Sequence, residues 1–589
     1  MSFVHFNKNG WFVDKNGQDL FINGINFAPR YVCTDFWRDW RPDRIRAALD
    51  DVRSMQLNAV RIPVQWADFE PEEGIYSETM MERFAEFISF CREREIYVMP
   101  WFLVGVATGL YDVPWRNGRS FLFDESMVRA EENHLRQFAS RFRDEEQILA
   151  WDICDEPEWY TRMENSPDTL PYPTEAFTAW VGRMYHAFKD TDPNHIVTLG
   201  FGHIGINDYG MDIPAIAEIL DCMAVTTYND PGCDVGDMPF NDAIMQYHLS
   251  VNRQNKPVYM CECPGNSSIN VSDALIGRLY TMTLYGGLLR GCAGYLPWCL
   301  NDYEREIWKE YSLNRSPCEQ GFGILDRFGN KKPAAEILEA FGIQMKDCRI
   351  TEYDAEKPQA ALVLPRSHGE VIHSRSIPAY LAFSKLSVPL DIRWVTRDFS
   401  EYPVIVISSM RGYKNEDWER ILQYTERGGN VLCLAENDIH SPYMQELFGL
   451  RPFGTRSGHV KYELCGAEVL ACYENGDPRV IKHTCGKGTV FCITDTLGRS
   501  CADDAVSAWI GRELDKFGIR RTCRSEDPLL EAGILMHRER DEALLILINH
   551  ADEDIRTRVK VCDGTGTETV YEVSLPAWKA ELRKIRFEK

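Results

Sequence analysis

The sequence lacks several features that would assign the protein to a class at once. It contains no run of about 20 apolar residues, the length that crosses a bilayer. The chain has 589 residues and a formal net charge of −24. A protein that binds nucleic acid is expected to have an excess of basic residues, which this sequence lacks. Residues 1–6 show no basic segment followed by an apolar one. We therefore expect no membrane association, no signal peptide and a cytoplasmic location.

Metal and disulfide patterns are also missing. The 19 cysteines are scattered, several lie inside apolar runs, and no C-x2-C pair is present. Cys261 and Cys263 flank Glu262, but alternation along a strand points both thiols away from that carboxylate. We expect reduced, buried cysteines, no metal and no cofactor.

The first 348 residues alternate between strand-like and helix-like runs. A hairpin-like lead-in covers residues 6–24, with turns at Asn7–Gly10 and Asp14–Gly17. The G-x-G-x-x-G turn of a dinucleotide-binding sheet is absent after the first strand. The pattern predicts a catalytic (β/α)8 TIM barrel over residues 1–348. Its eight strands are expected at residues 20–27, 59–64, 96–101, 148–154, 196–200, 222–228, 257–261 and 294–298.

Two further domains are expected downstream. Residues 349–522 restart a strand and helix alternation and predict a smaller flavodoxin-like α/β domain, a candidate surface for oligomerisation. Residues 523–589 contain short strands separated by polar turns and predict a small β-sandwich.

Two barrel strands end in a glutamate. Trp151–Pro157 delivers Glu156 at the end of the fourth strand, and Val258–Cys263 delivers Glu262 at the end of the seventh. Residues at the carboxyl ends of barrel strands meet at the catalytic face. Glycoside hydrolysis needs one carboxyl as acid and another as nucleophile or base, so the pair predicts a glycosidase. If either glutamate is considered alone, the competing interpretation is a solvent-exposed acidic residue on a loop.

Other residues are expected to support this pair. Arg61 ends an apolar strand and needs a carboxylate partner; we expect it to hold Glu262 charged, and the alternative is a structural ion pair. Tyr228 is positioned to donate a hydrogen bond to Glu262. The flat apolar faces of Trp298, Trp101 and Trp66 suit a sugar ring, although core packing is the competing interpretation. His203 and Asn207 follow the fifth strand as substrate contacts or ordinary loop residues.

Four segments resemble known glycoside hydrolase families. Asp155-Glu156-Pro157 resembles the Asn-Glu-Pro signature of the clan A glycoside hydrolases, which are retaining (β/α)8 enzymes. Asn23–Phe27 and Asn58–Pro63 resemble the opening of family 5 members, and Trp66–Tyr76 resembles a loop shared with family 35 and 42 galactosidases. This resemblance implies that Glu156 is the acid/base and Glu262 the nucleophile. The order of the three domains is similar to family 42 β-galactosidases, where the middle domain helps to build a trimer, and we expect a homo-oligomer (trimer or dimer).

Asp155 departs from the family pattern, which has Asn at this position. An ionised Asp accepts a hydrogen bond from a sugar hydroxyl but cannot donate one, and its charge raises the pKa of Glu156. Either the substrate differs at C2, as in mannose or an amino sugar, or Asp155 is held protonated.

These observations predict a retaining exo-β-glycosidase for short oligosaccharides or β-glycosides, most simply a β-mannosidase or β-galactosidase. The alternatives are a β-glucosidase or endo-β-glycanase of family 5 type and, in another class, a non-catalytic carbohydrate-binding barrel. An amidotransferase activity in the middle domain would need a nucleophile on a tight strand-to-helix turn flanked by glycines. Cys433 has no flanking glycines.

Overall fold

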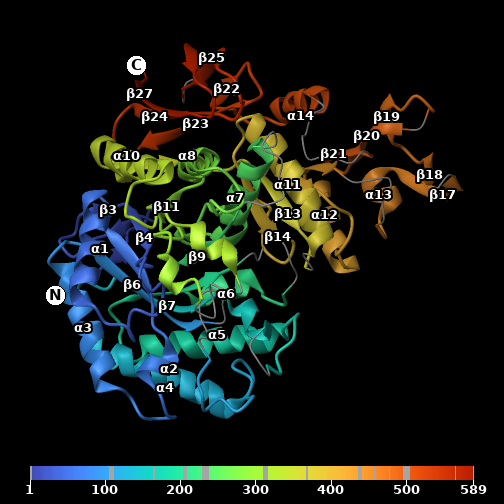
Figure 1. Cartoon of the computed structure of the whole chain (residues 1–589). Helices are drawn as coiled ribbons and strands as arrows, with labels where there is room; N and C mark the ends of the chain where they lie inside the picture. Colours follow the sequence, from blue (N-terminus) through green and yellow to red (C-terminus); the bar gives the residue numbers. More distant parts are fainter. Residues whose placement is uncertain are drawn as a thin grey trace. The chain divides into compact units, whose positions relative to one another are not determined.

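The computed structural model describes residues 3–104, 112–162, 166–202, 209–228, 238–309, 316–366, 369–434, 441–456, 459–476, 478–494, 504–563 and 566–587. These residues form two compact units by their contacts. The first takes most of the chain up to Asp354, and the second takes residues 355 onward together with most of helix α7 (Met238–Arg253) (Figure 1). The predicted boundaries at 348/349 and 522/523 stay predictions.

The first unit contains a closed barrel of eight parallel strands, so the (β/α)8 fold is confirmed. Strand β4 closes the ring by pairing with β5 on one side and β11 on the other. Most of these strands are buried along their whole length, as expected for strands covered on both faces. The barrel strands are β4 (Ile22–Asn26), β5 (Ala59–Pro63), β6 (Tyr97–Val104), β7 (Ala150–Asp155), β8 (Ile196–Phe201), β9 (Met223–Thr226), β10 (Val258–Glu262) and β11 (Cys292–Tyr295).

Helices follow the strands in the order that the sequence predicts. Polar side chains begin several of them: Ser77 accepts from the backbone N–H of Met80 at the start of α3, and Asp124 does the same for α4. The helices of this part of the chain are α1 (Pro42–Ser54), α2 (Trp66–Phe69), α3 (Glu78–Arg92), α4 (Glu125–Phe142), α5 (Thr174–Lys189), α6 (Ile213–Ile219), α7, α8 (Asp273–Leu289) and α10 (Pro333–Cys348).

The lead-in forms a three-stranded antiparallel sheet of β1 (His5–Phe6), β2 (Phe12–Val13) and β3 (Asp19–Leu20). Phe12 packs edge-on against Tyr259, near the start of β10, with ring centroids 5.9 Å apart. The sheet therefore lies against the amino ends of the strands and leaves the opposite end of the barrel, where the glutamates lie, to the loops.

The second unit contains a seven-stranded sheet in the order β14-β13-β15-β16-β21-β20-β19. Its five parallel strands follow the flavodoxin order 2-1-3-4-5, which confirms the predicted class. Strand β12 (Tyr353–Ala355) precedes this sheet in the chain and belongs instead to a separate four-stranded sheet. The sheet strands are β13 (Ala360–Leu364), β14 (Leu390–Trp394), β15 (Val404–Ile407), β16 (Asn430–Leu434), β19 (Glu468–Cys472), β20 (Pro478–Cys485) and β21 (Gly488–Ile493).

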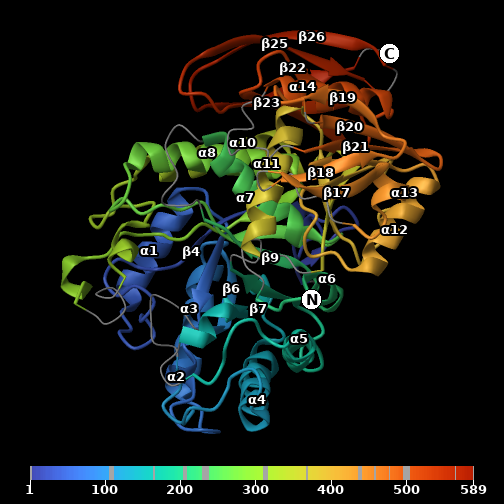
Figure 2. The ribbon, with the colours of Figure 1, turned by 90° about the vertical axis from the view of Figure 1, so that its right-hand side faces the viewer.

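Two antiparallel hairpins interrupt this order, and the sequence did not predict them. One is β17 (Leu450–Arg456) with β18 (His459–Leu464), which lies beside α13 (Met444–Phe448); the other is β19 with β20 (Figure 2). The remaining helices of this domain are α11 (Glu370–Lys385), α12 (Asn415–Glu426) and α14 (Asp504–Lys516).

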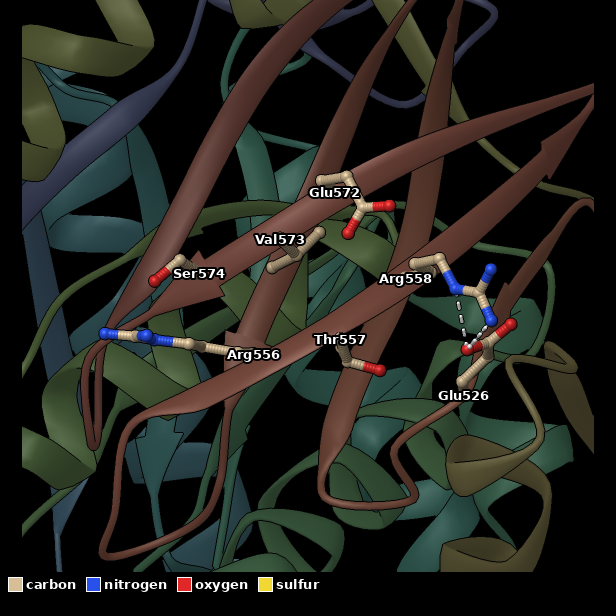
Figure 3. Close-up of a pocket in the computed structure, with 7 residues that line it drawn as sticks. All are labelled: Glu526, Arg556, Thr557, Arg558, Glu572, Val573 and Ser574. Carbon is tan, nitrogen blue, oxygen red and sulfur yellow. Dashed lines mark hydrogen bonds and ion pairs between the residues drawn. The ribbon is translucent and has the colours of Figure 1, made fainter.

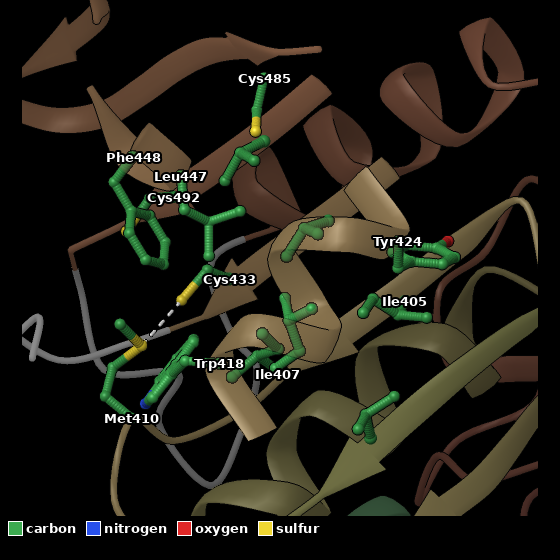
Figure 4. Packing of buried hydrophobic residues seen from close by; sticks show 14 of the residues in the cluster. Ile405, Ile407, Met410, Trp418, Tyr424, Cys433, Leu447, Phe448, Cys485 and Cys492 are labelled. Carbon is green, nitrogen blue, oxygen red and sulfur yellow. Dashed lines mark hydrogen bonds between the residues drawn. The ribbon is translucent and has the colours of Figure 1, made fainter. Parts of the chain in front are cut away.

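The core of the flavodoxin-like domain contains buried cysteines (Figure 4). Cys433 Sγ lies 3.4 Å from Met410 Sδ, and Trp418 of α12 packs in the same cluster. Cys433 is thus part of the apolar core, as a small hydrophobic residue.

The C-terminal segment forms two antiparallel sheets around one apolar core, which is the predicted β-sandwich. A shallow groove of about 740 Å³ lies on its outer face along β25 and β26, where Arg558 Nε donates to Glu526 Oε2 at 3.0 Å (Figure 3). The strands are β22 (Cys523–Ser525), β23 (Leu530–His537), β24 (Glu542–Asn549), β25 (Ile555–Cys562), β26 (Glu568–Leu575) and β27 (Ala580–Arg586).

Candidate active site

Both glutamates lie at the carboxyl ends of their strands. Glu262 is the last residue of β10, and Glu156 follows the last residue of β7. Their exposed fractions are 6% and 7%. Glu156 has a left-handed backbone (φ 47°), and its N–H donates to Gly200 O at 2.9 Å. A non-glycine residue in this strained conformation is typical of a functional site.

Arg61 is the central cation of the site. It is fully buried on β5, and its guanidinium contacts three carboxylates. Nη1 lies 3.0 Å from Glu262 Oε1, the contact expected from the sequence, and Nη2 lies 2.6 Å from Asp155 Oδ1. Nε and Nη2 also share Asp152 Oδ2, at 2.9 and 2.8 Å. One arginine of β5 thus links side chains of β7 and β10.

Asp152 and Asn26 complete the network around Arg61. Asp152 Oδ1 accepts from the Gly200 N–H at 3.0 Å, and burial raises the pKa of Asp152 to about 6, against the opposing effect of Arg61. Asn26 Oδ1 accepts from Arg61 at 3.2 Å, while its amide donates to the carbonyls of Cys261 and Leu296. These contacts fix the guanidinium in one position.

Tyr228 supplies the second hydrogen bond to Glu262. It lies two residues after β9, and its hydroxyl donates to Glu262 Oε2 at 2.7 Å. A Cβ at Gly265 would lie 2.8 Å from the Tyr228 ring, so glycine at that position lets the ring approach. Each Glu262 oxygen therefore has its own donor, Arg61 on one side and Tyr228 on the other.

Glu156 has a different environment. The Trp159 indole N–H donates to its Oε2 at 2.6 Å. The charges that act most strongly on it come from carboxylates: Glu158, then Asp155 and Glu262. Neither Trp159 nor Glu158 was predicted from the sequence, although both lie within three residues of Glu156.

The neighbours of Glu156 and Glu262 act differently on the pKa values of the two carboxyl groups. Burial raises the pKa of Glu156 well above its usual range, and the neighbouring carboxylates raise it further. Burial and Asp155 also raise the pKa of Glu262, but Arg61 and the Tyr228 hydrogen bond oppose that rise. Glu262 thus has a cation and a hydroxyl donor beside it, whereas the charged groups that act on Glu156 are carboxylates; this difference is the one that a nucleophile and an acid require.

The three tryptophans have different positions. Trp298 was predicted as the last residue of the eighth strand, but it lies beyond β11. It packs in a cluster with Tyr303 and Tyr228, and its indole donates to Glu319 at 3.1 Å. Burial raises the pKa of Glu319 to about 7. The Trp101 ring lies 5.2 Å from the Arg61 guanidinium carbon.

Trp66 packs in another aromatic cluster. Its ring centroid lies 5.3 Å from that of Trp115 and 5.1 Å from that of His134, and its indole donates to Glu70 at 2.6 Å. The structure thus brings Trp298 and Trp101 to the network of Arg61 and Tyr228, and places Trp66 in a cluster centred on Glu70. The predicted residues His203 and Asn207 lie outside the described residues.

One group of metal-type ligands occurs among the described residues, and it lies in the second unit. Asp242, Glu531 and His550 each bring one ligand atom within 4.8 Å of the others. His550 Nε2 is 3.1 Å from Glu531 Oε2 and 4.0 Å from Asp242 Oδ2. A hydrogen bond from the imidazole to Glu531 accounts for this arrangement. None of the described helices is long and apolar enough to cross a membrane.

Comparison with known proteins identifies the barrel. Residues 13–262, from the lead-in sheet to the second glutamate, match the model of the family described as cellulase (glycosyl hydrolase family 5). Residues 13–262 are a glycosyl hydrolase family 5 domain. The match includes Arg61, Asp155, Glu156 and Tyr228 and ends at Glu262.

Among curated proteins, 86 residues of this chain are 31% identical to a probable mannan endo-1,4-β-mannosidase C from Aspergillus terreus. This match covers 14% of the chain and 20% of that protein, so the chain spans about a fifth of the length of the curated relative.

Solved structures resemble the chain over almost its full length. An exo-β-1,4-mannosidase from Opitutaceae bacterium strain TAV5 has a TM-score of 0.70 and 21% identity, covering 87% of this chain and 98% of that one. A GH42 β-galactosidase from G. stearothermophilus has a TM-score of 0.73 and 15% identity, covering 96% and 98%. The multidomain architecture is therefore that of the GH42 β-galactosidases.

Proposed function

We propose that the protein is a retaining exo-β-glycosidase in which Glu262 is the nucleophile and Glu156 the general acid/base. The observation that carries this proposal is the unequal environment of the two glutamates. Arg61 and Tyr228 favour the charged form of Glu262, whereas burial among carboxylates favours the protonated form of Glu156. A non-catalytic binding barrel would not need one buried carboxylate paired with an arginine and a tyrosine beside another that lies among carboxylates.

The reaction then follows in two displacements. Glu262 attacks the anomeric carbon while Glu156 gives its proton to the departing oxygen, which leaves a glycosyl-enzyme ester on Glu262. Glu156, now ionised, takes a proton from a water molecule that attacks the same carbon, and Glu262 is released. The Trp159 N–H orients Glu156 in both steps.

We propose a β-mannoside as the preferred substrate. Two of the similar proteins are named mannosidases, one over a short segment and one over nearly the whole chain. Asp155 supports a substrate that offers a hydroxyl donor near C2, because one of its oxygens is engaged by Arg61 and the side chain accepts hydrogen bonds. A β-galactoside is the second candidate, since the full-length likeness includes GH42 β-galactosidases.

The test is a panel of p-nitrophenyl β-glycosides (manno, galacto, gluco, N-acetylglucosamino and fucosyl) with the wild type, Glu262→Ala and Glu156→Ala. The proposal expects one sugar to be hydrolysed, and both variants to lose at least about 10³-fold in kcat. Release of mannose alone from β-1,4-mannohexaose would support exo action. A ladder of intermediate oligosaccharides would instead indicate an endo-glycanase, and no turnover at all would favour a binding protein.

The proposed location and assembly have separate support. The cysteines of the described residues are free thiols, which fits a reducing compartment such as the cytoplasm. A homo-oligomer, trimer or dimer, is proposed from the GH42-like order of domains. Light scattering of the purified protein would give its mass as a multiple of 67.9 kDa, and a monomer would overturn this part.

A further inference from the structure

A third glutamate lies beside the acid/base. Glu158 is on the short helix η1 (Pro157–Arg162), is 4% exposed, and has no role in the mechanism above. The Glu158 carboxyl group lies beside Gly202, the residue that follows β8. A Cβ at Gly202 would lie 1.7 Å from Glu158 Oε1 and 3.0 Å from Glu156 Oε1. Both carboxyl groups therefore point at the same small space, which exists because residue 202 has no side chain.

Two carboxylates so close in a buried space do not both ionise readily. Among the described residues, the other groups that act most strongly on Glu156 add no positive charge: Asp155 and Glu262 are carboxylates, and Trp159 is a neutral donor. Two tyrosines also face these carboxylates. The charge of Glu158 raises the pKa of Tyr172, and the charge of Glu156 raises the pKa of Tyr228. Arg61 acts on the Glu262 side, where its guanidinium contacts Glu262 and Asp155.

We propose that Glu158 is a positioning residue that keeps the proton on Glu156 and so extends general-acid catalysis to higher pH. The proposal rests on the proposed function, because it assigns the acid role to Glu156. The proton needed for the leaving oxygen is then present on Glu156 before the substrate binds. Loss of that proton as the pH rises sets the alkaline limit of the glycosylation step.

The experiment compares wild type, Glu158→Gln and Glu158→Asp with two glycosides of the same sugar. A 2,4-dinitrophenyl glycoside has a leaving group that needs little protonation, whereas an alkyl glycoside depends on the acid. For Glu158→Gln we expect the alkaline limb of kcat/KM on the alkyl glycoside to move about one unit to lower pH, a loss of about tenfold at pH values above that limb. Activity on the dinitrophenyl glycoside should stay within about twofold.

Two outcomes would overturn the proposal. An unchanged alkaline limb in correctly folded Glu158→Gln would show that the proton on Glu156 is independent of Glu158. An equal loss on both glycosides at every pH would indicate a structural role. Glu158→Asp keeps the charge and should keep the limb near its wild-type position.

A measurement without turnover separates this proposal from the proposed function. Carboxyl ¹³C NMR of glutamate-labelled protein should show the Glu156 signal titrating at lower pH in Glu158→Gln than in wild type. If no glycoside is hydrolysed but this shift occurs, the proposed function fails and the coupling stands. If hydrolysis occurs without the shift, the coupling fails and the proposed function stands.

Discussion

At the scale of single residues, Arg61 carries the charge balance of the site. It is 0% exposed and contacts three carboxylates that are themselves buried. A buried ion pair gives little net stability relative to apolar residues, but removing one partner leaves uncompensated charge. Asp155 illustrates the same principle: its contact with Arg61 explains how an acidic residue is accommodated where the family pattern has Asn.

Replacing Arg61 tests this balance. Arg61→Met should lower the free energy of unfolding by about 3–5 kcal/mol, because Asp152, Asp155 and Glu262 lose their cation. The measurement is urea denaturation at pH 7. The matched control is Arg53→Gln, which breaks an exposed pair with Glu95 and should cost less than about 1 kcal/mol. Equal losses in the two variants would contradict the role given to Arg61.

Tyr228→Phe tests the second donor to Glu262. The hydrogen bond from Tyr228 stabilises the charged carboxylate and so lowers its pKa; without it, that pKa rises. Because the nucleophile must be ionised, the acidic limb of kcat/KM should move to higher pH in the variant, with the alkaline limb unchanged. A pH series of kcat/KM measures both limbs, and a shift of the acidic limb to lower pH would contradict the assignment.

At the scale of elements, the barrel depends on close contacts between strands. A Cβ at Gly24 of β4 would lie 2.5 Å from the Ala59 carbonyl oxygen of β5, and backbone cannot move aside as a flexible side chain does. Gly24→Ala should therefore destabilise the protein by about 1–3 kcal/mol. Gly454→Ala on β17, where nothing lies within 4 Å, is the control and should be near neutral. Thermal unfolding of both variants checks the difference.

Much of the architecture was predictable because the barrel strands are buried on both faces and appear as apolar runs. The strand ends were less accurate: the eighth strand is β11 (Cys292–Tyr295), earlier than predicted, so Trp298 lies on the following loop. The hairpins β17–β18 and β19–β20 were missed, since β19 alternates between exposed and partly buried positions and lacks an apolar run. Glu158 and Trp159 were missed because only the turn after β7, with Glu156 at positive φ, directs them back to the site.

At the scale of the whole molecule, helix α7 is a part of the barrel sequence that groups mostly with the second unit. It lies between strands β9 and β10 of the barrel in sequence, yet most of its residues group with the second unit. Within that unit His248 Nε2 lies 3.1 Å from His373 Nε2, and Ser250 Oγ lies 2.8 Å from the Tyr380 hydroxyl. A buried polar helix loses these partners when residues 355–589 are removed.

Truncation after Asp354 tests this organisation. We expect the fragment 1–354 to aggregate or to unfold at a much lower temperature than the full chain, because polar groups of α7 lose their hydrogen bonds. Circular dichroism and size-exclusion chromatography of the two proteins measure the effect. A stable, active fragment would show that α7 does not depend on the second unit.

The central claim is that Glu262 attacks the sugar and is retained as an ester. The direct measurement is mass spectrometry after reaction with an activated 2-deoxy-2-fluoro glycoside of the sugar that the enzyme hydrolyses. The account predicts one added sugar on the peptide that contains Glu262, and none in Glu262→Ala. Labelling of another carboxylate, or hydrolysis with inversion and no labelled peptide, would contradict it.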